Sequence, residues 1–207
     1  MPTSRTVGIV LAGGRSRRMG VDKAGLLLFD KPLVAWVVGA LRAVIGEVRL
    51  VGGSPQLARD LGVGFVPDLL DGAGPLAGIY AGLCAAGADV LVSACDTPLL
   101  QAPLLEGILR SSDDFDAVVP INQGEYEPLI GVYRQACLPP IAAALGAGKR
   151  QVRSVFGEIR LGVVAEAIWR RWDPKGLSFL NANTPEDLAR IQGIIEQQGL
   201  WKAQTAS

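Results

Sequence analysis

The sequence predicts an α/β fold with a mostly parallel β-sheet, and three observations support this prediction. Short apolar runs rich in β-branched residues alternate with segments whose apolar residues recur at helical spacing. The 26 Gly and 13 Pro residues imply many tight turns between these segments. A hydrophobic fraction of 49% and a charged fraction of 19% are ordinary for a globular protein. Because strands that alternate with helices pair through right-handed crossovers, we expect a parallel sheet.

The first half of the chain supplies most of the predicted sheet. Its expected strands cover residues 6–12, 47–51, 63–66 and 89–95, and its expected helices cover residues 33–44, 56–61 and 75–86. The helix that begins near residue 33 has Asp30 as its expected cap and Pro32 in its first turn. Each strand is followed by a helical segment, which is the pattern of a parallel sheet rather than of hairpins.

The second half departs from strict alternation. A helix near residues 103–110 is expected to precede strands at 117–120 and 129–133, which should pair antiparallel because their link is short. Helical pieces at residues 138–145 and 150–156 and strands at residues 161–164 and 178–181 follow. Thr184, Pro185 and Asp187 form a capping box for a last helix through residue 196. The length suits one domain over residues 1–199 with a flexible tail at 200–207.

The charge composition argues against two classes of partner. Lys plus Arg and Asp plus Glu both number 20, so no overall positive field would hold nucleic acid or an anionic membrane. The chain has no apolar signal-peptide core and no apolar run of about 18 residues. Its three Cys residues form no C-x-x-C pair. We therefore expect a soluble cytoplasmic protein without nucleic-acid or membrane partners.

The absence of histidine narrows the chemistry that the chain can perform. With no histidine in the sequence, Ser-His-Asp and Cys-His nucleophile systems and histidine-containing zinc sites are excluded. Catalysis must depend on carboxylates, lysine, arginine, backbone amides or a metal ion held by oxygen ligands.

The first chemical motif is the glycine-rich segment LAGGRSRRMGVDK at residues 11–23, after the first strand. Its three glycines let backbone N–H groups turn toward an anion, and Arg18 and Lys23 are among the positive charges around them. A surface turn with solvated arginines is the alternative, but the length and position of the run favour a triphosphate site. Gly20 precedes Val21 and not a lysine, so the Walker sequence is absent, and the glycine spacing differs from the dinucleotide fingerprint.

The second motif, CDTP at residues 95–98, places Asp96 directly after the expected strand 89–95. Ligands of open α/β sheets gather beyond the carboxyl ends of the strands, so we expect Asp96 in the same crevice as the glycine-rich segment. One well-placed carboxylate matches Mg²⁺, which fills much of its coordination shell with phosphate and water. The alternative is that Asp96 only caps the helix that follows.

Three weaker motifs complete the set of candidates. The Gly/Pro loop that contains Asp68 can bring this carboxylate near a base or ribose, with glycines such as Gly78 permitting close approach, or it is a turn before a helix. Asn181 and Asn183 offer amide oxygens to a metal or acceptor, and Asn181 is the better candidate. The basic residues in 149–153 either hold an acceptor phosphate or form a solvated helix face.

Together these motifs resemble the molybdenum cofactor guanylyltransferases, within the larger group of sugar-phosphate and cofactor nucleotidyltransferases. The resemblance covers nearly the whole chain, with the motifs in the family's order. They are LAGGRSRRMGVDK at 11–23, PD at 67–68, GPLAG at 74–78, CDTP at 95–98, EPL at 127–129 and NANTPEDL at 181–188.

The resemblance implies a Rossmann-like nucleotidyltransferase fold, a three-layer sandwich with a mostly parallel central sheet. An enzyme of this family would transfer GMP from GTP to the phosphate of the molybdopterin cofactor. Pyrophosphate would be released and the molybdopterin guanine dinucleotide cofactor would form. Mg²⁺ held by Asp96 would be the metal cofactor, and GTP and molybdopterin would be the substrates.

The resemblance also implies roles for single residues. Nucleotide contacts would fall on Leu11, Ala12 and Gly13, phosphate contacts on Lys23, and a contact with the guanosine part on Asp68. The residues themselves add Gly14, Gly78, Asn181 and Asn183 as binding candidates and Arg18, beside Lys23 and Asp96, as a catalytic candidate. One departure is that the second strand ends in Val51-Gly52-Gly53, where the family pattern leads us to expect an asparagine at the nucleotide.

Two alternatives remain open at this point. A cytidylyl or sugar-phosphate nucleotidyltransferase would use the same loop and metal, although the GPLAG segment favours the guanylyl branch. A non-catalytic nucleotide-binding scaffold is the alternative from another class, and the presence of both Lys23 and Asp96 favours catalysis over it. Other proteins of cofactor biosynthesis and recipient molybdoenzymes are candidate partners.

Overall fold

A β-sheet of eight strands forms the centre of the computed structural model, which describes residues 5–13, 23–68 and 74–198. The strand order is β10-β7-β9-β6-β1-β4-β5, and β8 pairs with β7 outside this path. The strands are β1 Thr6–Leu11, β4 Val48–Val51, β5 Gly64–Val66, β6 Asp89–Ala94, β7 Ala117–Asn122, β8 Glu125–Tyr126, β9 Ile130–Tyr133 and β10 Leu161–Val164. Two short strands, β2 Leu27–Leu28 and β3 Lys31–Pro32, form a separate antiparallel pair.

The main sheet is mostly parallel, as the sequence predicts. β1 runs parallel to β4 and β6, β5 runs parallel to β4, and β10 runs parallel to β7. β9 lies between β6 and β7 and is antiparallel to both. The antiparallel pairing expected for the strands near residues 117–120 and 129–133 is therefore confirmed.

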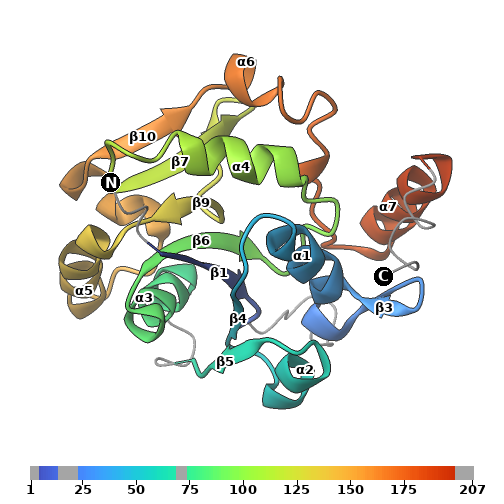
Figure 1. The fold of residues 1–207 in the computed structure, drawn as a ribbon, viewed down its shortest axis with the longest axis horizontal. Helices are drawn as coiled ribbons and strands as arrows, with labels where there is room; N and C mark the ends of the chain where they lie inside the picture. Colours follow the sequence, from blue (N-terminus) through green and yellow to red (C-terminus); the bar gives the residue numbers. More distant parts are fainter. Residues whose placement is uncertain (1–4, 14–22, 69–73, 199–207) are drawn as a thin grey trace.

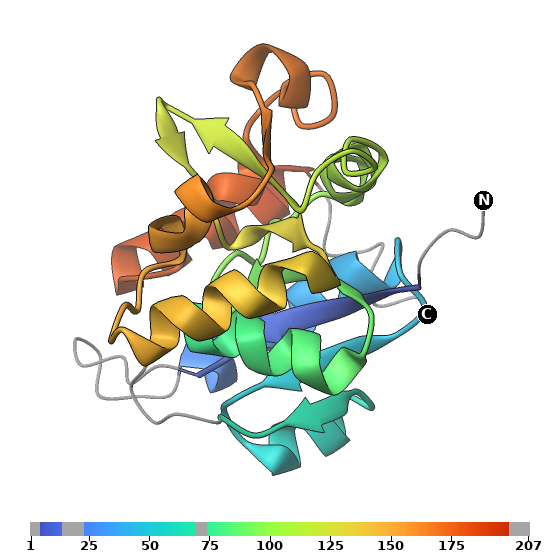
Figure 2. The ribbon, with the colours of Figure 1, turned by 90° about the vertical axis from the view of Figure 1, so that its left-hand side faces the viewer.

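Helices cover both faces of the sheet. Figure 1 shows α1 and α4 on one side of the strands and α3 and α5 on the other, and Figure 2 shows α3 and α5 side by side. The α-helices are α1 Leu33–Arg42, α2 Pro55–Asp60, α3 Pro75–Ala86, α4 Ala102–Arg110, α5 Leu138–Gly146, α6 Glu166–Trp169 and α7 Pro185–Gln198. The 3₁₀ segments are η1 Lys23–Gly25, η2 Gln135–Cys137, η3 Val152–Glu158 and η4 Leu177–Phe179.

The alternation of side chains along β1 shows why the fold has three layers. Val10 packs in a core cluster that includes Leu41 of α1 and Leu104 of α4. Ile9, the preceding residue, packs in a second cluster that includes Ile79 of α3. Successive residues of a strand point to opposite faces, so a strand that is apolar on both faces needs helices on both. The predicted three-layer sandwich is confirmed.

The last helix, α7, joins a third apolar cluster at one end of the sheet. Its Ile191 and Ile195 are buried against Leu28 of β2 and Trp36 of α1. The capping box predicted at its start is confirmed, because the Asp187 N–H donates to Thr184 Oγ1 and the Thr184 N–H donates to Asp187 Oδ2. In Figure 1, α7 lies next to β3 and away from the layered part of the fold.

Two local predictions are wrong. Asp30 does not cap α1: Pro32 occupies the N-cap position, and the β2–β3 pair, which the sequence did not suggest, leads directly into the helix. The strand predicted at residues 178–181 is instead the 3₁₀ segment η4, which follows Gly176 in the left-handed region at φ 64°. A buried Asp173 carboxylate accepts hydrogen bonds from the N–H groups at the start of this segment, so they are not available to a sheet.

Within the described residues, none of the helices is long and apolar enough to cross a membrane. The tail predicted from residue 200 onward, together with Gly14 and Arg18, lies outside the described residues. The backbone of Lys23 opens η1, but its side chain is also outside them.

Candidate active site

The candidate residues gather at one edge of the sheet because its parallel strands end there. β1, β4, β5 and β6 run in the same direction, so their carboxyl ends share an edge. Ala12 and Gly13 follow β1, Asp68 follows β5, and Asp96 follows β6. This is the edge at which open α/β sheets bind ligands. The structure therefore brings Leu11, Ala12, Gly13, Asp68 and Asp96 to one region, as the sequence predicts.

Three strand ends meet closely on the β1–β4–β5 side of this edge. The Ala12 N–H donates to Val51 O at 2.9 Å, and the Gly52 N–H donates to Val66 O at 2.9 Å. A Cβ atom added to Gly13 would lie 2.5 Å from Asp68 Oδ2. The Asp68 carboxylate thus occupies the space that a side chain on Gly13 would need. Any residue other than glycine at this position requires the Asp68 carboxylate or the backbone of Gly13 to shift.

Gly52 explains why the chain lacks the asparagine expected after the second strand. Its φ is 72°, in the left-handed region that favours glycine, and a Cβ atom there would lie 2.7 Å from Gly13 Cα. Sequence reasoning gave Gly52 no role, although the Gly-Gly pair at a strand end was the available signal. Gly52 is therefore part of the wall that faces Gly13 and Asp68.

Gly78 allows α3 to lie close to the end of β1. It lies in α3, is buried, and a Cβ atom there would meet Leu11 Cδ2 at 2.9 Å. The absence of a side chain lets α3 pack closely against the end of β1. The contact that the structure gives Gly78 is with Leu11, and a contact with bound nucleotide remains a prediction.

Asp96 lies in a turn that its neighbours hold in place. Thr97 Oγ1 donates to Ala94 O at 3.1 Å and lies 3.3 Å from Ser93 Oγ. Ser93 and Ala94 are the last two residues of β6. The next helix, α4, begins at Ala102 with Gln101 at its N-cap. The alternative in which Asp96 caps that helix is therefore ruled out, and Asp96 is half-buried at the end of β6.

The C-terminal asparagines also reach this edge. The Ala182 N–H donates to Asp96 O at 2.8 Å, so the exposed Asn181 and Asn183 flank a residue bonded to the Asp96 backbone. The Asn183 N–H in turn donates to Asp187 Oδ2 at 3.0 Å and is the main reason why the pKa of Asp187 is below its usual value. The structure thus brings both asparagines to Asp96 through the segment between them.

Glu127 is a residue at this edge to which sequence reasoning gave no role. Ser93 of β6 pairs with Ile130 of β9. Asp96 follows Ser93 by three residues and Glu127 precedes Ile130 by three, so both lie beyond the same end of two adjacent strands. Burial is the largest influence on the Glu127 carboxyl and raises its pKa, while Asn122 Nδ2 donates to it at 3.3 Å. Its signal in the sequence was the EPL motif.

The basic cluster near residue 150 has a contact that the sequence did not predict. Arg153 forms an ion pair with Glu125 at 2.6 Å and donates to Tyr126 O at 3.0 Å, so it ties η3 to the β7–β8 hairpin. Arg153 is thus exposed but bonded to a neighbouring element, and a role of the basic residues in holding an acceptor phosphate remains a prediction.

A mostly parallel α/β sheet with a glycine-lined strand junction and acidic side chains at its carboxyl edge has the arrangement of a ligand-binding α/β protein. The comparison with known families assigns the class, which is that of the NTP transferases. The MobA-like NTP transferase domain matches residues 8–163, and the chain belongs to this family.

Relatives and solved structures agree with this assignment. A probable molybdenum cofactor guanylyltransferase from Pelotomaculum thermopropionicum is 38% identical over 193 residues, which cover 93% of this chain and 94% of the relative. The crystal structure of molybdopterin-guanine dinucleotide biosynthesis protein A from Archaeoglobus fulgidus has a TM-score of 0.80 and 28% identity, and covers 92% of this chain and 98% of that one. The cytidylyltransferase 2-C-methyl-D-erythritol 4-phosphate cytidylyltransferase from Thermus thermophilus shares the fold at a TM-score of 0.66 and 19% identity, covering 91% of this chain and 98% of that one. The predicted family resemblance is confirmed.

Proposed function

We propose that this enzyme transfers GMP from GTP to the phosphate of molybdopterin, releasing pyrophosphate and forming the molybdopterin guanine dinucleotide cofactor. The relatives that match almost the whole chain carry the name molybdenum cofactor guanylyltransferase. The observation that carries the proposal is the junction of Gly13, Gly52 and Asp68 beside the turn of Asp96, at the edge where this fold binds ligands.

The β1–β4–β5 side of the edge is the proposed nucleotide side. Backbone atoms of Leu11, Ala12, Gly13 and Gly14 would contact the nucleotide. The Asp68 carboxylate accepts hydrogen bonds only, so it suits the hydroxyl or N–H donors of the guanosine part. Lys23 and Arg18 would contact the triphosphate, where a lysine acts as a point charge and an arginine as a fork of donors.

Asp96 is the proposed ligand of Mg²⁺, with the Asn181 amide oxygen as a second candidate. The donor set fits this ion, because the Asp96 carboxylate and the Asn181 amide carbonyl both offer hard oxygen atoms, and Mg²⁺ is usually held by one or two carboxylates with phosphate and water. When bound, Mg²⁺ would supply neutralisation of the negative charge that develops on the phosphates.

The transfer itself needs alignment more than acid–base chemistry. An oxygen of the acceptor phosphate forms a bond to the α-phosphorus of GTP, and the bond from that phosphorus to the β-phosphate oxygen breaks. Pyrophosphate leaves with the electron pair of the broken bond. The attacking phosphate oxygen is already anionic and needs no general base, which is consistent with a chain that has no histidine.

The cellular setting is part of the same proposal. We infer a cytoplasmic enzyme whose partners are other proteins of cofactor biosynthesis or recipient molybdoenzymes. Asp68 and the glycines around it would serve the nucleotide, and the half-buried Glu127 on the other side of Asp96 would face the acceptor.

GTP is expected to be used at least about tenfold better than CTP in kcat/KM, a difference of only about 1.4 kcal/mol in transition-state binding. The measurement is pyrophosphate release with GTP, CTP, ATP and UTP in the presence of Mg²⁺ and molybdopterin. Equal use of GTP and CTP would remove the guanylyl assignment and favour a cytidylyl or sugar-phosphate transferase. Tight GTP binding without pyrophosphate release would favour the non-catalytic scaffold.

A further inference from the structure

The segment that carries Asn181 is fixed by a buried carboxylate eight residues earlier. Asp173 is 3% exposed, and its two oxygens accept hydrogen bonds from the Leu177 N–H at 3.1 Å and the Ser178 N–H at 2.8 Å. These bonds shape η4 and set the direction in which the chain continues toward Asn181.

Ser178 connects this segment to the turn that follows β6. Its side chain is fully buried, and Ser178 Oγ accepts the Gln101 N–H at 3.0 Å. The Gln101 side chain donates to Leu99 O at 2.7 Å, within the same turn. Four residues after Ser178, the Ala182 N–H donates to Asp96 O at 2.8 Å. The two segments are therefore joined at both of their ends.

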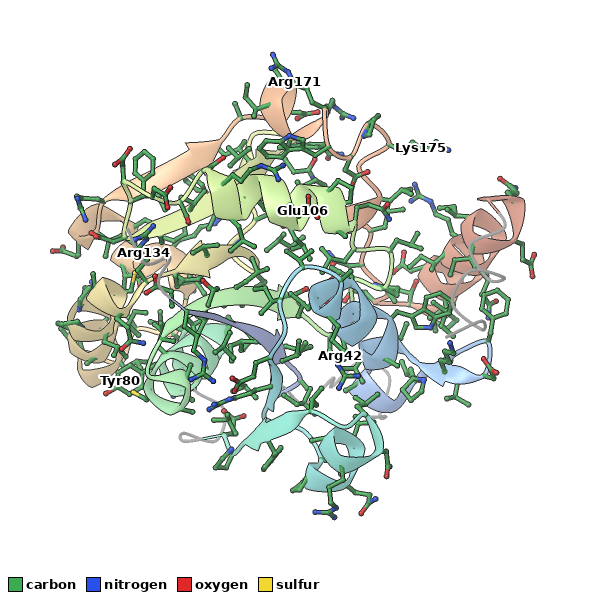
Figure 3. All side chains as sticks on the ribbon, in the orientation of Figure 1. Arg42, Tyr80, Glu106, Arg134, Arg171 and Lys175 are labelled. Carbon is green, nitrogen blue, oxygen red and sulfur yellow. The ribbon has the colours of Figure 1, made fainter. Side chains whose placement is uncertain are left out.

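The burial of Asp173 has a cost that its hydrogen bonds must offset. Within the described part of the chain, neither Lys nor Arg forms an ion pair with it. A buried carboxylate without a cation depends on N–H donors for stabilisation, and two such donors come from η4. In contrast, Lys175 in the same loop is exposed, and Figure 3 shows it pointing away from the body of the protein.

We propose that Asp173 is a positioning residue for the metal side of the active site. It holds η4 against Gln101, so that the Ala182 N–H meets the Asp96 backbone oxygen and Asn181, the residue before Ala182, is kept next to the turn of Asp96. The inference rests on the proposed function, since it takes Asp96 as the metal ligand. Residues that orient the ligands of a metal act in this way without touching the metal themselves.

The test compares two buried carboxylates that accept backbone N–H groups. Asp173→Asn keeps one oxygen that can accept a hydrogen bond. It replaces the other oxygen by an NH₂ group, which is a donor and cannot accept the Leu177 or Ser178 N–H that faces it. Asp89→Asn is the matched control, because Asp89 is 8% exposed and accepts the Gln135 N–H at 3.0 Å at the start of β6, the opposite edge of the sheet. Lys175→Gln controls for any change in the loop.

Asp173→Asn is expected to weaken Mn²⁺ binding roughly tenfold to 100-fold, the range for residues that orient metal ligands. Mn²⁺, used in place of Mg²⁺, would be followed by electron paramagnetic resonance in the presence of GTP. The Ala182 amide should also exchange hydrogen faster. Asp89→Asn and Lys175→Gln should leave both readouts as in the wild type, even where Asp89→Asn lowers the melting temperature.

A milder variant covers the case in which Asp173→Asn does not fold. Ser178→Ala removes only the acceptor for Gln101 and should shift both readouts in the same direction by a smaller factor. Unchanged metal affinity and unchanged Ala182 exchange in the folded variants would overturn the proposal, as would equal shifts in Asp89→Asn. Failure of the proposed function would look different: the wild type would bind Mn²⁺ with GTP yet transfer no nucleotide.

Discussion

Replacing Asp96 by Asn is expected to lower nucleotide transfer by roughly two to three orders of magnitude, the loss seen when one preorganised charge-stabilising group is removed. The change removes the negative charge of the carboxylate but keeps its size. The fold should persist, because the contact that joins Asp96 to Ala182 is made by its backbone oxygen. Product formation across a Mg²⁺ titration, with thermal unfolding measured in parallel, checks this result.

A wild-type rate and Mg²⁺ dependence in Asp96→Asn would contradict the metal role and most of the mechanism. Thr97→Val is the matched control, since the Thr97 hydroxyl holds the same turn through Ala94 O. It should lower the melting temperature more than Asp96→Asn and affect transfer less. The pair of variants thus separates loss of the turn from loss of the charge.

Replacing Gly13 by Ala is expected to lower kcat/KM for GTP by about 100-fold, because a misplacement of about 1 Å in a binding group can cost that much. The new methyl group would stand 2.5 Å from Asp68 Oδ2 and would force the carboxylate or the β1 end to move. Steady-state kinetics at saturating acceptor measure the effect. Most of it should appear in KM for GTP.

Gly39→Ala is the control for adding a methyl group elsewhere, because a Cβ atom there has open space on α1. It should leave the kinetics unchanged. The double variant Gly13→Ala with Asp68→Ala should be little worse than Asp68→Ala alone, since the clash is with the Asp68 side chain. Fully additive losses in the double variant would show that Gly13 and Asp68 act separately, which would contradict a close contact between them at the strand junction.

The fold could be predicted wherever the spacing of apolar residues and the positions of turn-forming residues indicated the same helix or strand. The strand β1 was predicted because a strand buried on both faces is a continuous apolar run. The helix α3 was predicted because it begins with Pro75, and Pro is common in the first turn of a helix. The strand predicted at residues 178–181 failed because its structure depends on Asp173, a tertiary contact that local pattern does not contain. The β2–β3 pair was missed because a strand of two residues is too short to show an alternation of apolar and polar side chains.

The site was predictable in outline and not in its contacts. Asp68 and Asp96 stood out because each follows a predicted strand, and the topology confirmed that both strands end at one edge. Gly52 and Glu127 were missed because their relevance comes from neighbours distant in sequence: Gly13 for the first, and the β6–β9 register for the second. The role of Arg153 in tying η3 to the hairpin likewise required the folded chain.

The central claim, that GMP passes from GTP to the molybdopterin phosphate, is tested most directly by following two labels. GTP labelled at the α-phosphorus or at the γ-phosphorus would be incubated with the enzyme, Mg²⁺ and molybdopterin, and the products separated. The account predicts that the α-label enters the dinucleotide product while the γ-label appears only in pyrophosphate, one for each product molecule. Transfer of the γ-label to the acceptor, or release of the α-label as free GMP without a labelled product, would contradict it.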